Sequence, residues 1–165
     1  METKYSTIEN TYNGIAMLKV EGAQIRFKNF SGVGSEFNTP GNRNFQLIIE
    51  DPMFADIVAR NGYNIKEHPS TDPNDPPYWT LQCNVGYKAV PPVINVYEGD
   101  RCTSLTEETV GILDGARIQY IDLLINGNAW EKLGKTGVKA WIREMHAVLE
   151  PMVFAGRDYS KMGGF

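Results

Sequence analysis

The stretch AQIRFKNFSG, residues 23–32, alternates apolar and polar side chains and predicts a β-strand. Successive side chains of a strand point to opposite faces, so Ile25 and Phe27 are expected to face a core. The opposite face is then expected to carry the remaining basic and aromatic side chains, Arg26, Lys28 and Phe30. The stretch therefore predicts a half-buried strand whose outer face is basic and ends in an aromatic ring.

Further strands are predicted where apolar side chains recur at every second position. The segment 14–20 is separated from 23–30 only by Glu21 and Gly22, so the two form separate strands or one long bent strand with a bulge at the glycine. The last two predicted strands are joined by a hairpin loop over 131–137. The remaining segments with this alternation are 44–50, 78–88, 92–97, 117–130 and 138–149.

One helix is predicted, because Asp51 and Pro52 are a favoured start and Gly62 a favoured stop. A capped turn over 105–108 is expected to run on towards Leu113. Segments 31–43 and 68–77 are rich in Gly, Pro, Asn and Ser and are expected to be loops.

The order of these elements predicts a mainly β fold, a five-stranded Greek-key barrel of the OB type with a short helix and extended loops. A parallel doubly wound sheet would need alternating helices, and the sequence lacks them. The expected organisation is an N-terminal segment over 1–13, an OB-fold domain over 14–150, and a C-terminal tail over 151–165.

The composition is that of an ordinary globular domain: 165 residues, 42% hydrophobic and 22% charged. No apolar run approaches the roughly 20 residues of a membrane helix, and the N-terminus does not resemble a secretory signal. We therefore expect a soluble intracellular protein that does not contact a membrane. The two cysteines, Cys83 and Cys102, are expected to be reduced, with Cys83 in the core.

The net charge of −4 is unevenly distributed along the chain. Residues 50–114 contain eleven acidic and four basic side chains, whereas residues 117–143 contain two acidic and five basic ones. Nucleic-acid binding depends on where positive charge lies and less on its total. Basic character in the first and last predicted strands is therefore compatible with a nucleic-acid surface.

The last predicted strand repeats the pattern of the first, with Lys139, Trp141 and Arg143 on one face. Cations beside aromatic rings are typical of grooves for single-stranded nucleic acid, because cations contact phosphates and rings stack on unpaired bases. Two simpler explanations stay open. Lys and Arg also occur on half-exposed strands that bind nothing, where their charge discourages aggregation. The rings of Phe30, Trp79 and Trp130 are as well explained by packing in the core.

Catalytic motifs are missing from the sequence: there is no Walker loop, no G-x-S-x-G and no H-E-x-x-H. The acidic side chains Asp72, Asp75, Glu107 and Glu108 are explained by a solvated loop and a helix start. His68 and His146 have no metal-ligand spacing with the cysteines. We therefore expect no enzyme, cofactor or metal, and a metal-dependent nuclease built from the carboxylates stays an alternative.

From about Val20 to about Glu150 the sequence resembles bacteriophage single-stranded DNA-binding proteins of the OB-fold type, chiefly in KNFSG (28–32), GNRNF (41–45) and KTGVKAW (135–141). The resemblance implies a non-enzymatic protein in the cytoplasm of an infected bacterium. Such a protein coats and protects single strands, with little sequence preference, during phage DNA replication or recombination. The alternative from another class is a small β-barrel virion or interaction protein.

The resemblance also implies where the groove lies and which partners to expect. These are single-stranded DNA and other phage replication or recombination proteins, and a homo-oligomer is compatible with the sequence. The end of the chain, GRDYSKMGGF (156–165), keeps an aromatic but lacks the acidic run with which many such proteins recruit partners. The expected DNA contacts are Arg26, Lys28, Phe30, Arg43, Phe45, Tyr78, Lys135, Lys139, Trp141 and Arg143.

Overall fold

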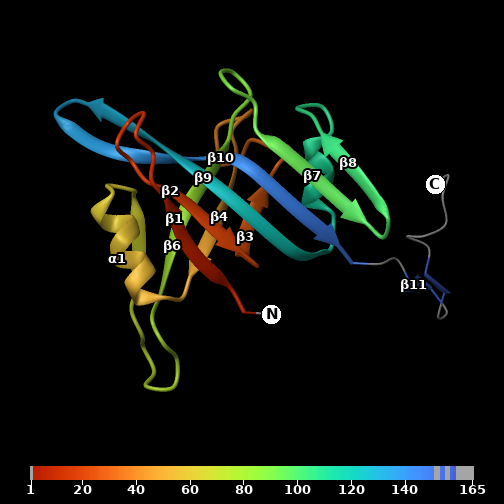
Figure 1. The fold of residues 1–165 in the computed structure, drawn as a ribbon, viewed down its shortest axis with the longest axis horizontal. Coiled ribbons are helices and arrows are strands. Elements are labelled where there is room, and N and C mark those ends of the chain that lie inside the picture. The colour runs from red at the N-terminus through yellow and green to blue at the C-terminus, as the bar shows by residue number, and fades with distance from the viewer. Residues whose placement is uncertain (1, 151–152, 155–156, 159–165) are drawn as a thin grey trace.

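The computed structural model describes residues 2–150, 153–154 and 157–158 (Figure 1). No helix within these ranges is long and apolar enough to cross a membrane. The elements in chain order are β1 (Lys4–Ile8), β2 (Met17–Glu21), β3 (Gln24–Asn29), β4 (Arg43–Ile49), α1 (Pro52–Arg60), β5 (Ile65–His68), β6 (Tyr78–Val85), β7 (Val93–Glu98), β8 (Arg101–Leu105), the 3-10 helix η1 (Val110–Asp114), β9 (Ile118–Lys132), β10 (Lys135–Leu149), β11 (Val153–Phe154) and β12 (Arg157–Asp158).

Six strands of the main sheet pair in the order β2-β9-β10-β6-β4-β3, and the two strands at the ends of this series, β2 and β3, are consecutive in the chain; we call these six strands the ring. In the sheet β1 precedes β2 in this order, and only Gly22 and Ala23 separate β2 from β3 in sequence. The Gly22 backbone has φ 67°, and the Ala23 amide donates to the Ile121 carbonyl at 2.8 Å, so β2 and β3 form a bent segment that pairs with β9 and then with β4. β10 pairs with β6 in parallel, and the other ring pairs are antiparallel.

This ring has the connectivity of the predicted OB-type barrel, and the mainly β class is confirmed. The number of strands differs from the prediction, because the sheet contains ten strands where five were expected. The additional strands are attached to the ring: β1 to β2, β5 to β6, and the β7–β8 hairpin to β10. In Figure 1 this hairpin extends the sheet on the side away from α1.

A bulge in β3 reverses the expected direction of two aromatic rings. Arg26 pairs with Gln46 and Asn29 with Asn44, so three steps along β3 match two steps along β4. Phe27, within the extra step, has φ 53° and a side chain that is 71% exposed. Phe30 falls on the inner face and is 0% exposed. The expectation that Phe27 faces the core and Phe30 faces outward is therefore wrong.

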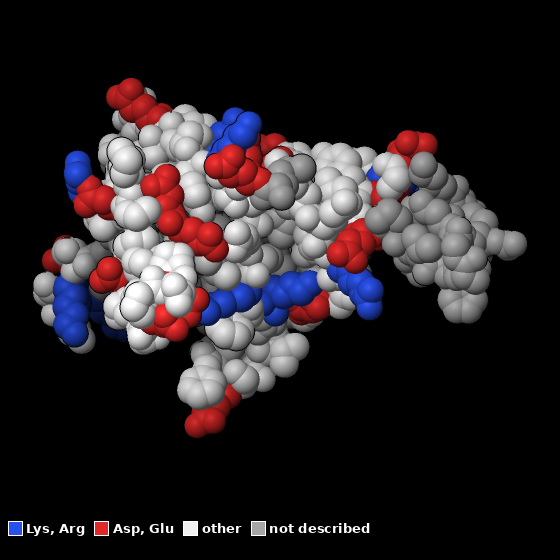
Figure 2. Space-filling view, turned by 90° about the horizontal axis from the view of Figure 1, so that it is seen from below, with Lys and Arg blue, Asp and Glu red and all other residues white. Residues whose placement is uncertain are grey.

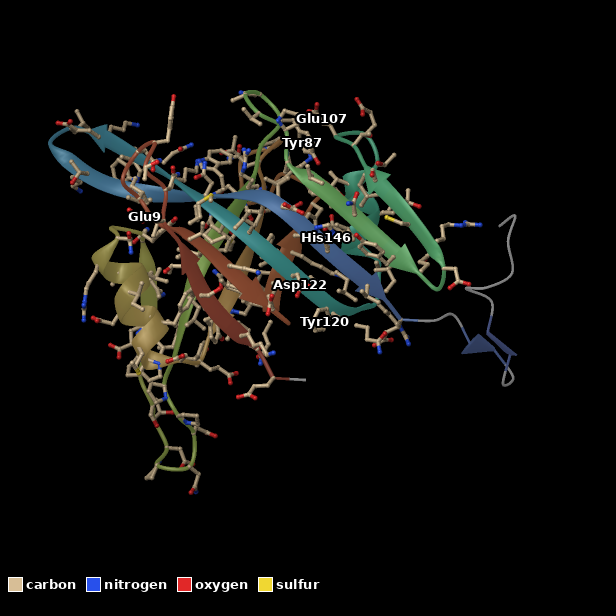
Figure 3. The ribbon with its side chains drawn as sticks, viewed as in Figure 1. Glu9, Tyr87, Glu107, Tyr120, Asp122 and His146 are labelled. Carbon is tan, nitrogen blue, oxygen red and sulfur yellow. The ribbon has the colours of Figure 1, made fainter. Side chains whose placement is uncertain are left out.

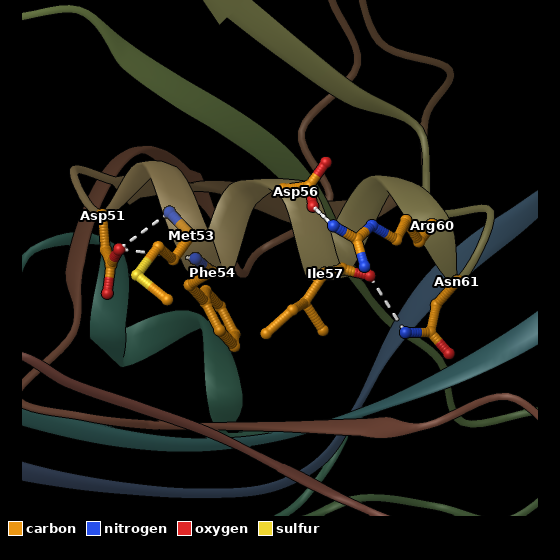
Figure 4. Close-up of polar contacts among 7 residues, drawn as sticks. All are labelled: Asp51, Met53, Phe54, Asp56, Ile57, Arg60 and Asn61. Carbon is orange, nitrogen blue, oxygen red and sulfur yellow. Dashed lines mark hydrogen bonds and ion pairs between the residues drawn. The ribbon is translucent and has the colours of Figure 1, made fainter.

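The helix α1 begins and ends where the sequence predicts (Figure 4). The Asp51 carboxylate accepts the Met53 amide at 2.9 Å and also the Phe54 amide, which satisfies two free donors of the first turn. At the other end the Asn61 side chain donates to the Ile57 carbonyl at 2.9 Å, and Gly62 follows with φ 90°. The capped turn expected over 105–108 differs from the structure: Leu105 ends β8, and the 3-10 helix η1 that runs past Leu113 begins at Val110 without a side-chain cap at Thr109.

Other boundaries differ from the sequence expectations. Strands β1, β5 and β8 were not predicted, and β6 ends at Val85 where the prediction extends to Lys88. The hairpin between β9 and β10 is tighter than expected, because pairing continues to Lys132 and Lys135. Of the predicted tail 151–165, only β11 and β12 lie within the described residues.

The core lies inside the ring and is formed by the inward positions of its strands. On β10 the predicted alternation is observed: Val138, Ala140 and Ile142 are buried, and their neighbours face outward. Cys83 is fully buried and Cys102 is exposed, and both are free thiols, as expected. Burial raises the pKa of the Cys83 thiol.

Candidate nucleic-acid interface

The outer face of the barrel carries a row of polar side chains across four strands. Asn44 on β4 pairs with Asn84 on β6, Asn84 pairs with Trp141 on β10, and Trp141 pairs with Asn126 on β9. Side chains of paired residues point the same way, so the indole lies between the amides of Asn84 and Asn126, and Asn44 extends the row by one strand. Asn84 and Trp141 are neighbours because β6 and β10 pair in parallel.

A groove of about 910 Å³ lies over Asn84, Trp141 and Asn126 of this row. We call it the Trp141 groove. It contains four basic side chains and one carboxylate, so its charge differs in sign from that of the whole chain. Its lining residues are Pro40, Gly41, Asn42, Arg43, Asn84, Val85, Gly86, Tyr87, Lys88, Ala89, Val90, Pro91, Glu107, Asn126, Asn128, Lys139, Trp141, Ile142 and Arg143.

The Trp141 ring is held by two neighbours. A Cβ at Gly86 would lie 2.6 Å from Trp141 Cζ3, so the ring rests against the glycine backbone. The Nζ of Lys139 lies 4.8 Å from the centroid of the Trp141 indole, within cation–π range. The indole is half-buried, and its place on the outward face of β10 leaves it accessible from the groove.

Arg43 and Tyr87 form the wall of the groove opposite β10. The Arg43 Cζ lies 5.5 Å from the Tyr87 ring centroid, and its Nη1 lies 3.8 Å from Glu107 Oε1. The Arg43 Nε and the Tyr87 hydroxyl are buried and have no hydrogen-bond partner among the described residues. Burial raises the pKa of the Tyr87 phenol further above its ordinary range, and the protonated hydroxyl is a hydrogen-bond donor at neutral pH.

A second group of aromatic and basic side chains lies at β3, β5 and β6, and we call it the Phe27 cluster. It consists of Arg26, Phe27, His68 and Tyr78. The Arg26 Cζ lies 4.9 Å from the Phe27 centroid and 5.5 Å from the Tyr78 centroid, and Nη1 donates to the Tyr78 hydroxyl at 3.3 Å. The rings of Tyr78 and His68 stack at 4.5 Å. Lost hydration, together with the charges of Arg26 and Lys66, lowers the pKa of His68.

The structure separates the ten expected contact residues into several places. Lys28 donates from Nζ to the Ala116 carbonyl at 2.8 Å, and Lys135 lies exposed on the hairpin, outside the groove lining. Phe30 and Phe45 are 0% and 1% exposed, with centroids 5.5 Å apart, so their rings belong to the core and cannot stack on a base. The groove holds Arg43, Lys139, Trp141 and Arg143, and the Phe27 cluster holds Arg26 and Tyr78.

Residues 7–151 match the model of the family described as a phage ssDNA-binding domain. The chain belongs to this family. The match confirms the resemblance to phage single-stranded DNA-binding proteins. No curated protein sequence matches the chain.

The fold of this phage ssDNA-binding domain is similar to solved structures of the single-stranded DNA-binding protein from bacteriophage Enc34. For the C-terminally truncated form the TM-score is 0.55 at 11% identity, and the match covers 93% of this chain and 99% of that one. For the complex with ssDNA the TM-score is 0.53 at 12% identity, and the match covers 92% and 99%. At these identities the likeness establishes the shared fold.

Several groove residues of the phage ssDNA-binding domain were not singled out from sequence. Tyr87 was expected inside a strand, but the strand ends at Val85 and the following residues turn into the groove wall. The amides of Asn84, Asn126 and Asn128 carry no charge signal. Their outward position in the predicted alternation was the available clue.

Other faces of the domain are more acidic or mixed. Figure 2 shows acidic and basic side chains interspersed on the face seen from below. A second hollow of about 340 Å³ includes Glu21, Asp122, Glu144 and His146, with Lys19 as its basic residue. The Nε2 atom of His146 lies 2.6 Å from Glu144 Oε1, and its Nδ1 atom lies 2.8 Å from the Tyr97 hydroxyl. Asp122 and His146 are labelled in Figure 3. Within the described residues no three His, Cys, Asp or Glu side chains are grouped to hold a metal ion.

Proposed function

We propose that this phage ssDNA-binding domain binds single-stranded DNA in the Trp141 groove without reading its sequence. The observation that carries the proposal is one outward indole between basic side chains, beside two buried polar atoms without a partner in the described part of the chain, Arg43 Nε and the Tyr87 hydroxyl. Buried polar atoms are normally hydrogen-bonded, so we expect the Arg43 and Tyr87 side chains to shift on binding and to pair these two atoms with phosphate or sugar oxygens.

The chemistry of the groove favours a single strand over a duplex. Stacking on Trp141 needs an exposed base face, which paired and stacked bases do not present. Lys139 and Arg143 lie on both sides of the indole on the outer face of β10 and are placed to contact the backbone on either side of a stacked base. The buried Asn84 amide donates one of its two N–H groups to the Ala140 carbonyl at 3.0 Å, which fixes the orientation of this side chain.

The role that follows is coating and protection of single strands during phage DNA replication or recombination. We place this role in the cytoplasm of the infected bacterium, without catalysis, and with other phage replication or recombination proteins and self-association as further partners. The family match over 7–151 supports a DNA-binding unit close to the expected 14–150. One of the similar Enc34 structures is a complex with ssDNA, which supports the choice of ligand.

The test is a titration of tryptophan fluorescence with a pyrimidine-rich single strand at several salt concentrations, and with the matching duplex. We expect quenching that weakens with salt by about 0.7 log units of affinity per log unit of salt for each phosphate contact, and much weaker binding of the duplex. Trp141→Ala should abolish most of the quenching, while the control Trp130→Phe should retain it.

The alternatives make different predictions in the same experiment. No binding of either oligonucleotide at low salt would contradict DNA binding and favour a virion or interaction protein. Cleavage of the strand that depends on added Mg²⁺ would favour the nuclease.

A further inference from the structure

We infer that Phe27 is a second base-stacking position, and that a bound single strand runs from the Trp141 groove across β6 and β4 to the Phe27 cluster. The inference rests on the proposed function, because it extends the path of the same ligand. It assigns a role to a ring that neither the core nor the Trp141 groove uses.

The backbone presents the Phe27 ring to solvent. The residue lies in the β3 bulge with φ 53°, a conformation that aromatic residues rarely adopt, and its side chain is 71% exposed. Burial therefore offsets little of the cost of this conformation. Bulges of this kind often redirect a side chain near a functional site, and here the bulge directs a large ring outward.

Arg26 is held in place next to this ring. Its Nε donates to Gln46 Oε1 at 2.9 Å and its Nη1 donates to the Tyr78 hydroxyl, so two bonds fix the guanidinium. The guanidinium lies close to both the Phe27 and Tyr78 rings, and Tyr78 is in turn stacked on His68. A fixed cation beside an exposed ring repeats the arrangement of Lys139 and Trp141. Such a pair can contact one base and one phosphate.

The surface between the two rings carries amides and no charge. Arg26 pairs with Gln46, and Gln46 pairs with Gln82. Two residues further along β6 is Asn84, opposite Trp141. Three strand spacings separate β3 from β10, roughly 14 Å across the sheet. The acidic hollow with Asp122 and Glu144 lies over β10, β9 and β2, away from β4 and β3, so charge favours a path towards β3.

The experiment compares oligonucleotide lengths in Phe27 variants. Phe27→Asn removes the ring but suits the positive φ, since Asn tolerates this conformation. Phe27→Tyr keeps a stacking ring, and Met53→Ala removes a 78% exposed side chain on α1 as the matched control. We expect Phe27→Asn to bind a dinucleotide, which is too short to span both rings, as the unsubstituted protein does, and to bind a strand of about 16 nucleotides five- to a hundredfold more weakly, the range for one stacked base. The other two variants should bind both strands normally.

The result separates this inference from the proposed function. If Phe27→Asn binds the long strand as the unsubstituted protein does, the inference is wrong, while a loss in Trp141→Ala would still support the groove. If Trp141→Ala binds both strands normally, the groove proposal itself fails. Ultraviolet cross-linking of the unsubstituted protein to the long strand gives a second readout that does not depend on a variant's folding. We expect an adduct within residues 24–29, and cross-links that leave this segment unmodified would overturn the inference.

Discussion

The Trp141 indole packs against Gly86, the residue that directly follows β6. The contact joins the end of β6 to the middle of β10, which is distant in sequence, and it leaves no room for a side chain at position 86. The position of the Trp141 ring is therefore set by the backbone of Gly86, which is less mobile than a flexible side chain. In the proposed groove, this contact pre-organises the stacking surface before DNA arrives.

Gly86→Ala should displace the Trp141 ring, because the new Cβ would lie 2.6 Å from Cζ3. We expect a shifted tryptophan emission and single-strand affinity reduced by about fivefold or more, which is the lower end of one stacking contribution. Gly115→Ala is the matched control, since a Cβ there meets nothing within 4 Å. Unchanged emission and affinity in Gly86→Ala would show that the contact does not position the ring.

Glu107→Gln should increase single-strand affinity at low salt. The carboxylate lies 3.8 Å from Arg43 Nη1 and is the one acidic residue lining the groove, so it competes with phosphate for the guanidinium. Because its side chain is 54% exposed, we expect a gain of no more than about fivefold. Fluorescence titration of this variant and of Glu98→Gln, on the distant β7–β8 hairpin, gives the comparison; weaker binding by Glu107→Gln would contradict the competition.

Lys139→Ala should lower the salt dependence of binding. Loss of one phosphate contact is expected to reduce the slope of log affinity against log salt by about 0.7 for a single strand. Lys4→Ala on β1, which removes an exposed charge away from the groove lining, should leave the slope unchanged. Equal slopes in both variants would remove Lys139 from the interface.

Asp51→Ala should destabilise the fold without changing DNA affinity. The carboxylate caps α1 through the Met53 and Phe54 amides, and loss of such a cap costs about 1 kcal/mol. Urea unfolding measures the difference, and Asp51→Asn should retain most of the stability because Asn is an equally good cap. A large loss of DNA binding in Asp51→Ala would instead connect α1 to the interface.

The two thiols should differ in reactivity over a wide pH range. Cys102 is exposed, whereas Cys83 is buried and its pKa is raised, which disfavours the reactive thiolate. In native protein we expect alkylation of Cys102 alone, and raising the pH from 7 to 9 should not add Cys83. Denaturation should expose both. Mass spectrometry counts the adducts, and native labelling of Cys83 would show that β6 opens.

Much of the local structure could be predicted because it depends on neighbours in the sequence. The cap at Asp51 and the stop at Gly62 follow from local hydrogen bonds and backbone freedom. The outward position of Lys139, Trp141 and Arg143 follows from strict alternation along β10 up to that point. For the same reason Trp141 could be proposed as a stacking residue from sequence alone.

The sequence pattern could not predict that Phe27 faces outward and Phe30 faces the core. β3 has one more residue than the part of β4 with which it pairs, and this extra residue changes the face of every later side chain of β3. The extra residue lies between Arg26, which pairs with Gln46, and Asn29, which pairs with Asn44. Alternation counted from the sequence assumes a regular strand. It therefore assigns each of these two rings to the wrong face.

By itself, the sequence determined the mainly β class, the capped helix and the basic, aromatic face of the last strand, because these depend on side chains a few positions apart. Only the tertiary structure decided the interface. The parallel pairing of β6 with β10 sets Asn84 opposite Trp141, and burial leaves Arg43 Nε and the Tyr87 hydroxyl without a partner among the described residues. Strand pairing and burial join residues distant in the chain, and local patterns do not encode which of them meet.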